Sequence, residues 1–277
     1  MIEAETAFAK INLTLSVRHR RSDGYHDIDT VFAFADSGDT VAARTASRIT
    51  LAMDGPFAAG LSDTDNLVIR AAETLRSHSG YTGGAEMKLT KQLPVASGIG
   101  GGSADAAATL RLLNRLWRLD LPVATLAEIS APLGADIPAC VYSRPVRGMG
   151  TGTQMQVMEQ VSIAGMPLLL VNPLIAVPTA EIFARWNGVD GGAVGECSAM
   201  AAARSGSNSL EPAAISLCQP IAGILSQLRQ SDCIAARMSG SGATCFGLYE
   251  NVAARDKAAL QIHRVFPDYW TLACAVR

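Results

Sequence analysis

The chain contains few charged and few aromatic residues: 17% of its 277 residues are charged and 5% are aromatic. Its formal net charge of −2 gives no sign of a basic surface for nucleic acid or an anionic membrane. No uninterrupted apolar run approaches the roughly 20 residues of a membrane-spanning helix. The first residues, MIEAET, lack the basic and apolar segments of a signal peptide. We therefore expect a cytoplasmic protein that binds neither nucleic acid nor a membrane; no feature of the sequence indicates an oligomeric state.

Cysteine and histidine are too scattered to predict a metal site or a disulfide framework. The chain has no C-x-x-C pair, and no two histidines have the spacing of metal ligands on a helix. Isolated cysteines in a chain of this size are typical of buried apolar thiols. The residues concerned are Cys140, Cys197, Cys218, Cys233, Cys245 and Cys274, and His19, His26, His78 and His263.

Hydrophobic residues make up 49% of the chain, which is enough for a large core. In the first half, alternating apolar residues and turn residues predict strands at 7–17, 27–35, 39–43, 49–53 and 85–90. Asp65 is the expected N-cap of a helix that ends at Ser79 and Gly80, and Pro122 is expected to start another that ends near residue 131.

The second half of the chain predicts a similar mixture of strands and helices. Strands are expected up to Val157, at 167–172, at 234–238, after the turn at 239–243 and at 269–276, and helices at 178–186, about 209–230 and 253–265. Residues 187–208, rich in Gly, Ser and Ala, are expected to form a mobile loop. The pattern predicts an α+β protein, and a change of composition near residue 160 predicts two domains, 1–158 and 159–277.

Residues 94–107, PVASGIGGGSADAA, are the most informative segment. Glycine occupies four of the five positions from 98 to 102, which allows left-handed backbone and close approach to a ligand. Ser103 and Asp105 are good N-cap residues, and a helix-forming run follows them. A glycine loop that opens onto a helix N-terminus presents N–H groups and the positive end of the helix dipole to one volume. The segment therefore predicts a phosphate site, with a glycine-rich turn that binds nothing as the alternative.

This loop differs from other phosphate-binding motifs. A P-loop carries Lys followed by Ser or Thr after its last glycine, and no lysine follows a glycine here. The dinucleotide fingerprint has a third glycine where this chain has Ser103, and Pro94 interrupts the preceding strand. The H-R-D and D-F-G signatures of protein kinases are absent.

Two ionisable residues stand in apolar segments. Lys10, one of only four lysines, lies near Asn12 in a strand, and Asp136 interrupts an apolar run. Each has an ordinary structural explanation, Lys10 as an exposed lysine of an edge strand and Asp136 as a helix cap. The segment DGYH at 23–26 is by itself a turn followed by an aromatic pair.

Together these segments resemble the GHMP kinase superfamily over nearly the whole chain. The matching segments are AKIN at 9–12, DGYH at 23–26, DNLV at 65–68, the glycine loop at 94–107, LGADIP at 133–138, NPLIAVPT at 172–179, NSLE at 208–211 and MSGSGA at 238–243. The first two point to the branch that phosphorylates a cytidine-diphosphate-linked polyol in isoprenoid synthesis, because a cytidine substrate needs a nucleobase platform.

The resemblance implies a two-lobed GHMP-kinase fold, with a β-rich N-terminal ATP-binding lobe and a ferredoxin-like C-terminal lobe. It also implies a left-handed βαβ crossover, which is an exception to the usual hand. The implied activity is that of a small-molecule kinase that uses ATP, with Mg²⁺ carried by the nucleotide.

The resemblance also assigns roles to individual residues. Asp136 is implied to accept the proton of the substrate hydroxyl, and Lys10 to stabilise the alkoxide. Tyr25 and Phe183 are implied to sandwich cytosine while His26 reads its edge, and Asn12 and Thr179 to hold the rest of the substrate. The implied ATP-binding residues are Asn66, Lys91, Pro94, Val95, Ala96, Ser97, Gly98, Ile99, Gly100, Gly101, Gly102, Ser103 and Ala104.

The chain departs from the family pattern at three positions. Ala104 replaces a second serine, Ser209 stands where aspartate is more common, and Ser97 also differs. Phe183 has a spacing that suits helix packing equally well. Two alternative functions stay open: another small-molecule kinase of the superfamily, and a catalytically silent sensor with the same fold. The presence of both Lys10 and Asp136 counts against the sensor.

Overall fold

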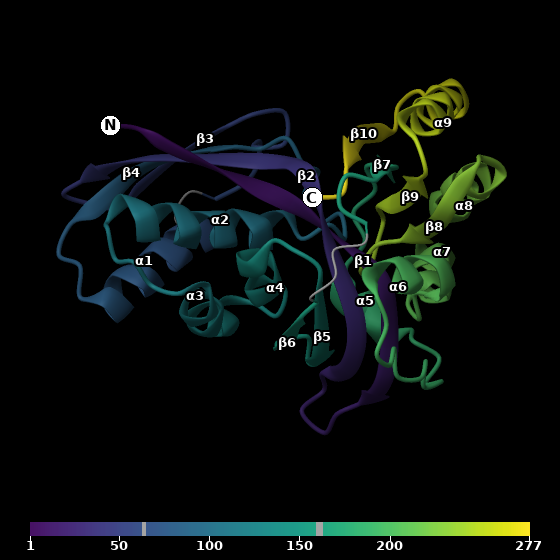
Figure 1. The fold of residues 1–277 in the computed structure, drawn as a ribbon, viewed down its shortest axis with the longest axis horizontal. Coiled ribbons are helices and arrows are strands. Elements are labelled where there is room, and N and C mark those ends of the chain that lie inside the picture. The colour runs from purple at the N-terminus through teal and green to yellow at the C-terminus, as the bar shows by residue number, and fades with distance from the viewer. Residues whose placement is uncertain (63–64, 159–162) are drawn as a thin grey trace. The chain divides into compact units, whose positions relative to one another are not determined.

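A computed structural model describes residues 1–62, 65–158 and 163–277, drawn as a ribbon in Figure 1. Its contacts group the chain into two compact units that alternate along the sequence. Unit 1 comprises Met1–Ala9, Ser37–Val95 and Gly100–Ser143, and unit 2 comprises Lys10–Asp36, Ala96–Ile99 and Arg144–Arg277. The predicted boundary at 158/159 adjoins residues outside the described ranges, so the division into 1–158 and 159–277 stays a prediction.

Unit 1 is a sheet with helices on one side, as Figure 1 shows. Strands β2 (His26–Ala46) and β4 (Gly84–Thr90) pair antiparallel through residues 40–46, and β3 (Thr50–Asp54) pairs parallel to β4. Helix α1 (Leu67–Ser79) connects β3 to β4, so this part of the chain contains a βαβ unit. The remaining helices are α2 (Gly101–Leu116), α3 (Val123–Ser130), the 3₁₀ turn η1 (Ala131–Leu133) and α4 (Ile137–Tyr142).

The helix ends in unit 1 correct two predicted caps. Asn66, not Asp65, is the N-cap of α1, and its side chain accepts a hydrogen bond from Val68 N at 2.9 Å. Helix α2 begins at Gly101, two residues before Ser103. Gly80 ends α1 as expected, with a left-handed φ of 68°.

The two strands predicted at 27–35 and 39–43 form one strand, β2. Gly38 makes this continuity possible because the backbone passes very close to Ala7. A Cβ at position 38 would lie 1.9 Å from the Ala7 carbonyl oxygen. The glycine therefore marks a close crossing within the unit and not a turn. The long strand β1 (Glu3–Arg20) pairs with β2.

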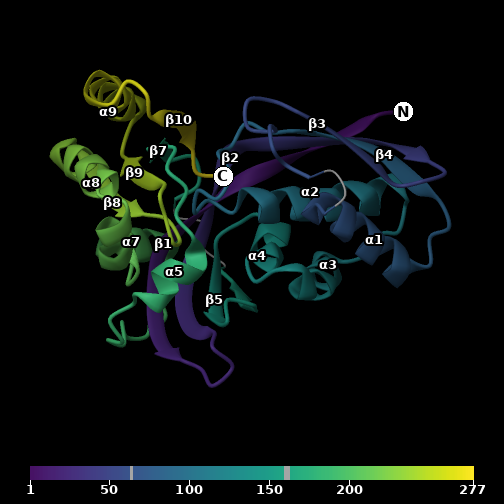
Figure 2. The ribbon, with the colours of Figure 1, turned by 180° about the vertical axis from the view of Figure 1, so that it is seen from behind.

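Unit 2 contains a four-stranded antiparallel sheet in the order β10-β7-β9-β8. Its strands are β7 (Pro167–Asn172), β8 (Cys233–Met238), β9 (Cys245–Tyr249) and β10 (Trp270–Ala275). Helices α8 (Pro220–Gln230) and α9 (Val252–Val265) lie along one side of it (Figure 2). This order confirms the ferredoxin-like arrangement. The unit also holds β5 (Val146–Gly150) and β6 (Gln154–Val157), which pair antiparallel, and β5 pairs with β2 through residues 28–32.

The predicted helix at 178–186 is confirmed by α5 (Thr179–Ala184), whereas two other short helices of unit 2, α6 (Ala199–Ser205) and α7 (Glu211–Leu217), change the predicted elements. The loop predicted at 187–208 contains α6, capped by Ser198, whose Oγ accepts from Ala201 N at 3.1 Å. The single helix predicted at 209–230 is divided into α7 and α8. Pro220 supplies no N–H to continue the first helix and instead begins the second.

Within the three described ranges, no helix combines the length and the apolar character needed to cross a membrane.

Candidate active site

The backbone of the glycine loop alternates between left-handed and ordinary conformations. Ala96, Gly98 and Gly100 have φ of 51°, 78° and 64°. Gly98 has no room for a side chain, because a Cβ would lie 2.5 Å from the Ser239 carbonyl oxygen and 2.6 Å from that of Gly242. Alternation of this kind builds concave backbone surfaces that bind anions.

The carbonyl groups of this loop are hydrogen-bonded within unit 2. Thr244 N donates to Ser97 O at 3.0 Å, and Lys10 N donates to Ile99 O at 2.9 Å. Ser239 Oγ donates to Gly98 O at 2.9 Å. In a trans peptide the N–H points opposite to the preceding carbonyl. The N–H groups of residues 98–100 therefore point away from these partners, as a phosphate-binding loop requires.

The N-terminus of α2 has the same character. Gly100 is its N-cap and, having no side chain, makes no side-chain capping hydrogen bond. The first N–H groups of a helix have no intrahelical acceptors, so an uncapped N-terminus can receive an anion. The predicted caps Ser103 and Asp105 lie inside the helix.

Lys91 and Asn66, both expected near the nucleotide, have protein partners. The Lys91 ammonium is buried and pairs with Asp39, and with Asp105 at 2.7 Å. Asn66 uses its carbonyl to cap α1 and its amide to donate to Ser62 O at 3.0 Å. These contacts give both residues a structural task in unit 1.

Asp136, in unit 1, is half-buried at the N-cap position of α4. Its backbone carbonyl accepts from Cys140 N at 3.1 Å, but its side chain makes no capping hydrogen bond to the described helix. The helix-cap explanation for this carboxylate is therefore wrong.

Lys10 and Asn12, in unit 2, lie on one face of β1, because alternate residues of a strand share a face. Lys10 is only 2% exposed, and its Nζ donates to Asn12 Oδ1 at 2.9 Å and lies 5.4 Å from the centre of the Phe32 ring. Asn12 donates from Nδ2 to Thr30 Oγ1 at 2.8 Å and from its backbone N to Ser239 Oγ at 3.2 Å. The explanation of Lys10 as an exposed edge-strand residue is therefore wrong.

The rings expected around cytosine lie in unit 2. His26 faces Phe183, with ring centres 5.0 Å apart and planes 34° apart, and Trp186 meets His26 edge-on at 5.6 Å. Burial, followed by the charge of Arg20, lowers the pKa of His26. Tyr25 is 68% exposed.

Thr179 lies at the start of α5, where its hydroxyl is 2.9 Å from Ser241 Oγ. This contact brings the segments at 172–179 and 238–243 together.

Sequence reasoning missed several residues of these surroundings. Asp39 joins Lys91, Trp186 joins His26, and Ser239 joins Asn12 to the glycine loop. Asp29 accepts from Arg147 at 2.8 and 2.6 Å. Burial opposes ionisation of Asp29, but the bonds from Arg147 and from a backbone N–H outweigh it and lower its pKa. The available signals were weak: an acidic residue within a strand, and a serine inside a repeated Ser-Gly pattern.

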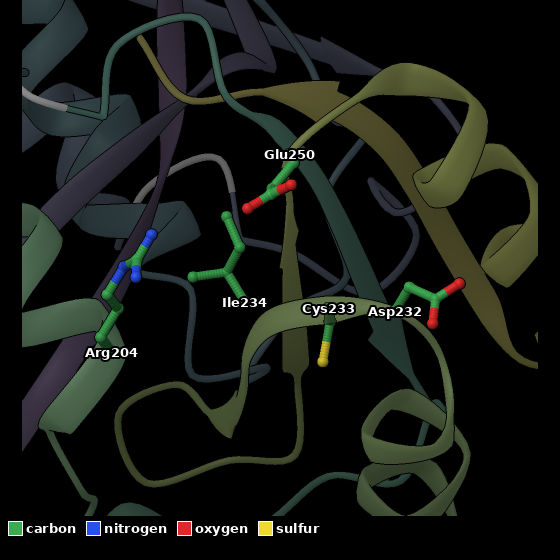
Figure 3. A pocket seen from close by; sticks show the side chains of 5 residues that line it. All are labelled: Arg204, Asp232, Cys233, Ile234 and Glu250. Carbon is green, nitrogen blue, oxygen red and sulfur yellow. The ribbon is translucent and has the colours of Figure 1, made fainter.

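A separate shallow pocket in unit 2 is shown in Figure 3. Arg204 and Glu250 lie on either side of Ile234, whereas the Cys233 sulfur points elsewhere, and Asp232 completes the lining. None of the predicted site residues line it.

Family comparisons agree with the two-part architecture. Residues 66–144 match the GHMP kinases N terminal domain, and residues 190–268 match the GHMP kinases C terminal domain. Over 100% of this chain and 96% of the relative, the chain is 48% identical to the 4-diphosphocytidyl-2-C-methyl-D-erythritol kinase of Rhizorhabdus wittichii. It is also 48% identical to the kinase of that name from Sphingopyxis alaskensis, over 99% of this chain and 98% of the relative.

Solved structures give the same result. A crystal structure of 4-(cytidine 5'-diphospho)-2C-methyl-D-erythritol kinase has a TM-score of 0.80 and 30% identity, covering 99% of each chain. A homoserine kinase from Cytophaga hutchinsonii has a TM-score of 0.72 at 16% identity, covering 96% of this chain and 95% of that one, which shows the shared fold. The chain therefore belongs to the GHMP kinase family, and it matches that family's 4-diphosphocytidyl-2-C-methyl-D-erythritol kinases from end to end.

Proposed function

We propose that this protein transfers the γ-phosphoryl group of ATP to the 2-hydroxyl of 4-diphosphocytidyl-2-C-methyl-D-erythritol. The products are the 2-phosphate and ADP, in the non-mevalonate route to isoprenoid precursors. The observation that carries the substrate assignment is 48% identity, over the full length, to kinases of that name. The local geometry of residues 97–100 supports a nucleotide-phosphate site, and the rings of His26, Phe183 and Trp186 support a nucleobase site.

The phosphates of ATP bind the glycine loop in this proposal. The N–H groups of residues 98–100 point away from the partners that hold the carbonyls of 97–99. The positive end of α2 contributes roughly 0.3–1 kcal/mol toward a nearby negative charge. The Mg²⁺ that accompanies the nucleotide neutralises phosphate charge, as is general in phosphoryl transfer.

Asp136 and Lys10 carry the chemistry. Asp136 accepts the proton of the attacking hydroxyl; a positioned base of this kind contributes roughly 10²- to 10⁴-fold in rate. Lys10 stabilises the alkoxide and orients the γ-phosphoryl group. Its ammonium is held by Asn12 in a buried setting, where a charge acts more strongly than in water.

The ring cluster of His26, Phe183 and Trp186 supports the cytidine assignment. The lowered pKa of His26 keeps its imidazole neutral at neutral pH, so one nitrogen donates and the other accepts. That pattern suits the mixed donor and acceptor edge of cytosine. Phe183 and the exposed Tyr25 offer faces for stacking, which is worth roughly 1–3 kcal/mol per base in nucleic-acid binders.

Asn12 and Thr179 hold the diphosphate and erythritol parts in this proposal. The Asn12 amide has a second hydrogen besides the one given to Thr30. The Thr179 hydroxyl is already oriented by Ser241.

An ATP-consumption assay tests this function directly. ADP formation is measured with the cytidyl substrate, with its uridyl analogue, and with mevalonate, homoserine and galactose. We expect efficient turnover of the cytidyl form and a large loss for the uridyl form, because buried polar groups would be left unmatched. Equal efficiency with both would refute base recognition. Turnover of another acceptor alone would make the protein a different GHMP kinase, and nucleotide binding without turnover would make it a sensor.

A further inference from the structure

A buried ionic cluster lies in unit 1, formed by Lys91, Asp39 and Asp105. The Lys91 ammonium pairs with one oxygen of Asp39 and, at 2.7 Å, with Asp105 Oδ2. The three side chains are 3%, 0% and 5% exposed. One positive charge is thus shared by two carboxylates that are almost completely removed from water.

The cluster contacts both ends of the glycine loop. On the entry side, Asp39 Oδ1 accepts hydrogen bonds from Gln92 N at 2.5 Å and Leu93 N at 2.8 Å. On the exit side, Asp105 belongs to the second turn of α2. At the first residue of α2, a Cβ added to Gly101 would lie 3.4 Å from Lys91 Nζ and 3.9 Å from Asp39 Oδ2. The ammonium therefore lies close to the first residue of this helix.

This cluster stabilises the start of a helix that has no side-chain cap. The N-terminus of α2 lacks a side-chain cap in the described chain, which leaves its N–H groups for a ligand. A helix end without a cap loses a contribution of typically about 1 kcal/mol to its stability. The buried cluster ties the first turns of α2 to Lys91 and Asp39 through the side chain of Asp105, which leaves the N–H groups of the helix start unused by this pairing.

We propose that Lys91, Asp39 and Asp105 are positioning residues that hold the two ends of the glycine loop in the arrangement that binds nucleotide phosphate. In this role Lys91 acts on the loop and does not touch the nucleotide, unlike the direct contact implied by the family resemblance. The inference rests on the proposed function only in taking ATP as the phosphoryl donor.

The two carboxylates differ in how they hold Lys91. Asp39 is fully engaged, with one oxygen on Lys91 and the other on two backbone N–H groups. Asp105 uses Oδ2 for Lys91, and its buried Oδ1 has no hydrogen-bond partner among the described residues. Loss of the Asp105 charge is therefore tolerable if an acceptor for Lys91 remains, whereas loss of Asp39 also releases Gln92 and Leu93.

The test measures the affinity of the whole chain for ADP and for a non-hydrolysable ATP analogue, each with Mg²⁺, by calorimetry. The variants are Lys91→Met, Asp39→Asn and the double change. Asp105→Asn and Asp105→Ala form a second pair of variants. If Lys91→Met does not fold, the comparison of these two still tests the proposal. Lys88→Met is the matched control, since Lys88 forms an exposed pair with Asp54 in the same unit.

Positioning predicts that Lys91→Met and Asp39→Asn each weaken nucleotide binding roughly tenfold to a hundredfold, as small misplacements in a site do. The double variant should lose no more than the worse single variant, because both changes break one interaction. Asp105→Asn should bind nucleotide with nearly wild-type affinity, because its amide oxygen still accepts a hydrogen bond from Lys91. Asp105→Ala should weaken nucleotide binding, and Lys88→Met should leave it unchanged. The KM for the cytidyl substrate should stay nearly constant throughout.

Two results would overturn the proposal. If Lys91 contacts the nucleotide directly, Lys91→Met weakens binding while Asp39→Asn leaves it unchanged or tightens it, because a competing carboxylate is lost. If the cluster only stabilises the fold, melting temperatures fall and nucleotide affinity of the folded variants does not. The proposed function is tested separately, with the wild-type protein. If the wild type binds nucleotide but does not phosphorylate the cytidyl substrate, the proposed activity is refuted and the binding data of the variants still test the positioning role.

Discussion

The stability of this protein should depend on pH through Asp105. Burial raises the pKa of this carboxyl from its ordinary value of 3.8 to about 7; the charge of Asp39 adds to the shift, and that of Lys91 opposes it. The shift arises because ionised Asp105 would be a second buried negative charge beside a single ammonium.

The sign follows from proton binding. Between about pH 4 and pH 7 the folded state holds a proton at Asp105 that the unfolded state has lost. The stabilisation is therefore fully present below pH 4 and is lost as the pH rises through 7. A difference of about three pKa units, at about 1.4 kcal/mol per unit, amounts to roughly 4 kcal/mol at most.

Asp105→Asn imitates the protonated side chain at every pH. The variant should match the wild type only below about pH 4, where both folded and unfolded wild type are protonated; its advantage in free energy of unfolding should grow from there to roughly 4 kcal/mol at most at pH 8. Urea unfolding of both proteins at pH 3.5, 5, 6, 7 and 8 measures the difference. Asp54→Asn is the control: hydrogen bonds from Lys88 and Thr90 lower the pKa of Asp54, so its contribution is gained, not lost, as the pH rises through its titration range. A difference between Asp105→Asn and wild type that does not change with pH would refute the reasoning.

Four further substitutions test the site. Asp136→Asn should nearly abolish turnover while nucleotide and substrate still bind by calorimetry, because an amide cannot accept the hydroxyl proton; near-normal kcat would remove this residue from the base role. Gly98→Ala should raise the KM for ATP and cost more than about 1 kcal/mol in urea unfolding, since its φ is 78° and a Cβ meets two carbonyl oxygens. Gly102→Ala lies inside α2, where a Cβ would lie 3.5 Å from Leu67 Cδ1, an ordinary contact distance; its free energy of unfolding should be unchanged or higher, and equal effects at both positions would contradict this reasoning. Trp186→Leu should raise the KM for the cytidyl substrate several-fold by releasing His26, as an aromatic pair contributes about 0.5–1.5 kcal/mol; a change in the KM for ATP instead would argue against a role at the base.

Much of the fold was predictable because its signals are local. The apolar run at 167–172 and the Gly80 helix end needed only periodicity and turn chemistry, and both are confirmed. The errors arose where a tertiary contact overrode a local signal. From the sequence alone, Gly38 favours a turn. In the folded chain its missing side chain lets β2 lie close to the Ala7 carbonyl, a contact that the local sequence does not indicate. Helix α6 was missed because its alanines lie among glycines and serines that favour loops.

Candidate residues of the site were predictable where chemistry shows in residue type. Lys10 is conspicuous because a lysine in an apolar strand is unusual, and its partner Asn12 follows from the two-residue period of a strand. Asp39 was not predictable, since its importance rests on Lys91, 52 residues away, and on two backbone N–H groups. The family resemblance drew attention to the residues expected to face substrate, and the structure adds those that hold them in place.

The phosphate specificity that we propose for the glycine loop rests on which of its backbone groups already have hydrogen-bond partners. Three successive carbonyls, at residues 97–99, accept hydrogen bonds from Thr244, Ser239 and Lys10. In planar trans peptides each N–H of residues 98–100 points opposite to the carbonyl before it, and so away from these partners. Backbone donors of this kind favour an anion whatever the identity of the side chains nearby. Side chains contribute to this arrangement only indirectly. Gly98, which has no side chain, leaves space for two carbonyls, and the hydroxyl of Ser239 donates to the Gly98 carbonyl. Ser239→Ala should therefore weaken ATP binding although the serine need not touch ATP, and restoration by Ser239→Thr, which keeps the hydroxyl, would show that the hydrogen bond to Gly98 is the cause; equal nucleotide affinity in Ser239→Ala and wild type would show that the loop holds its polarity without it.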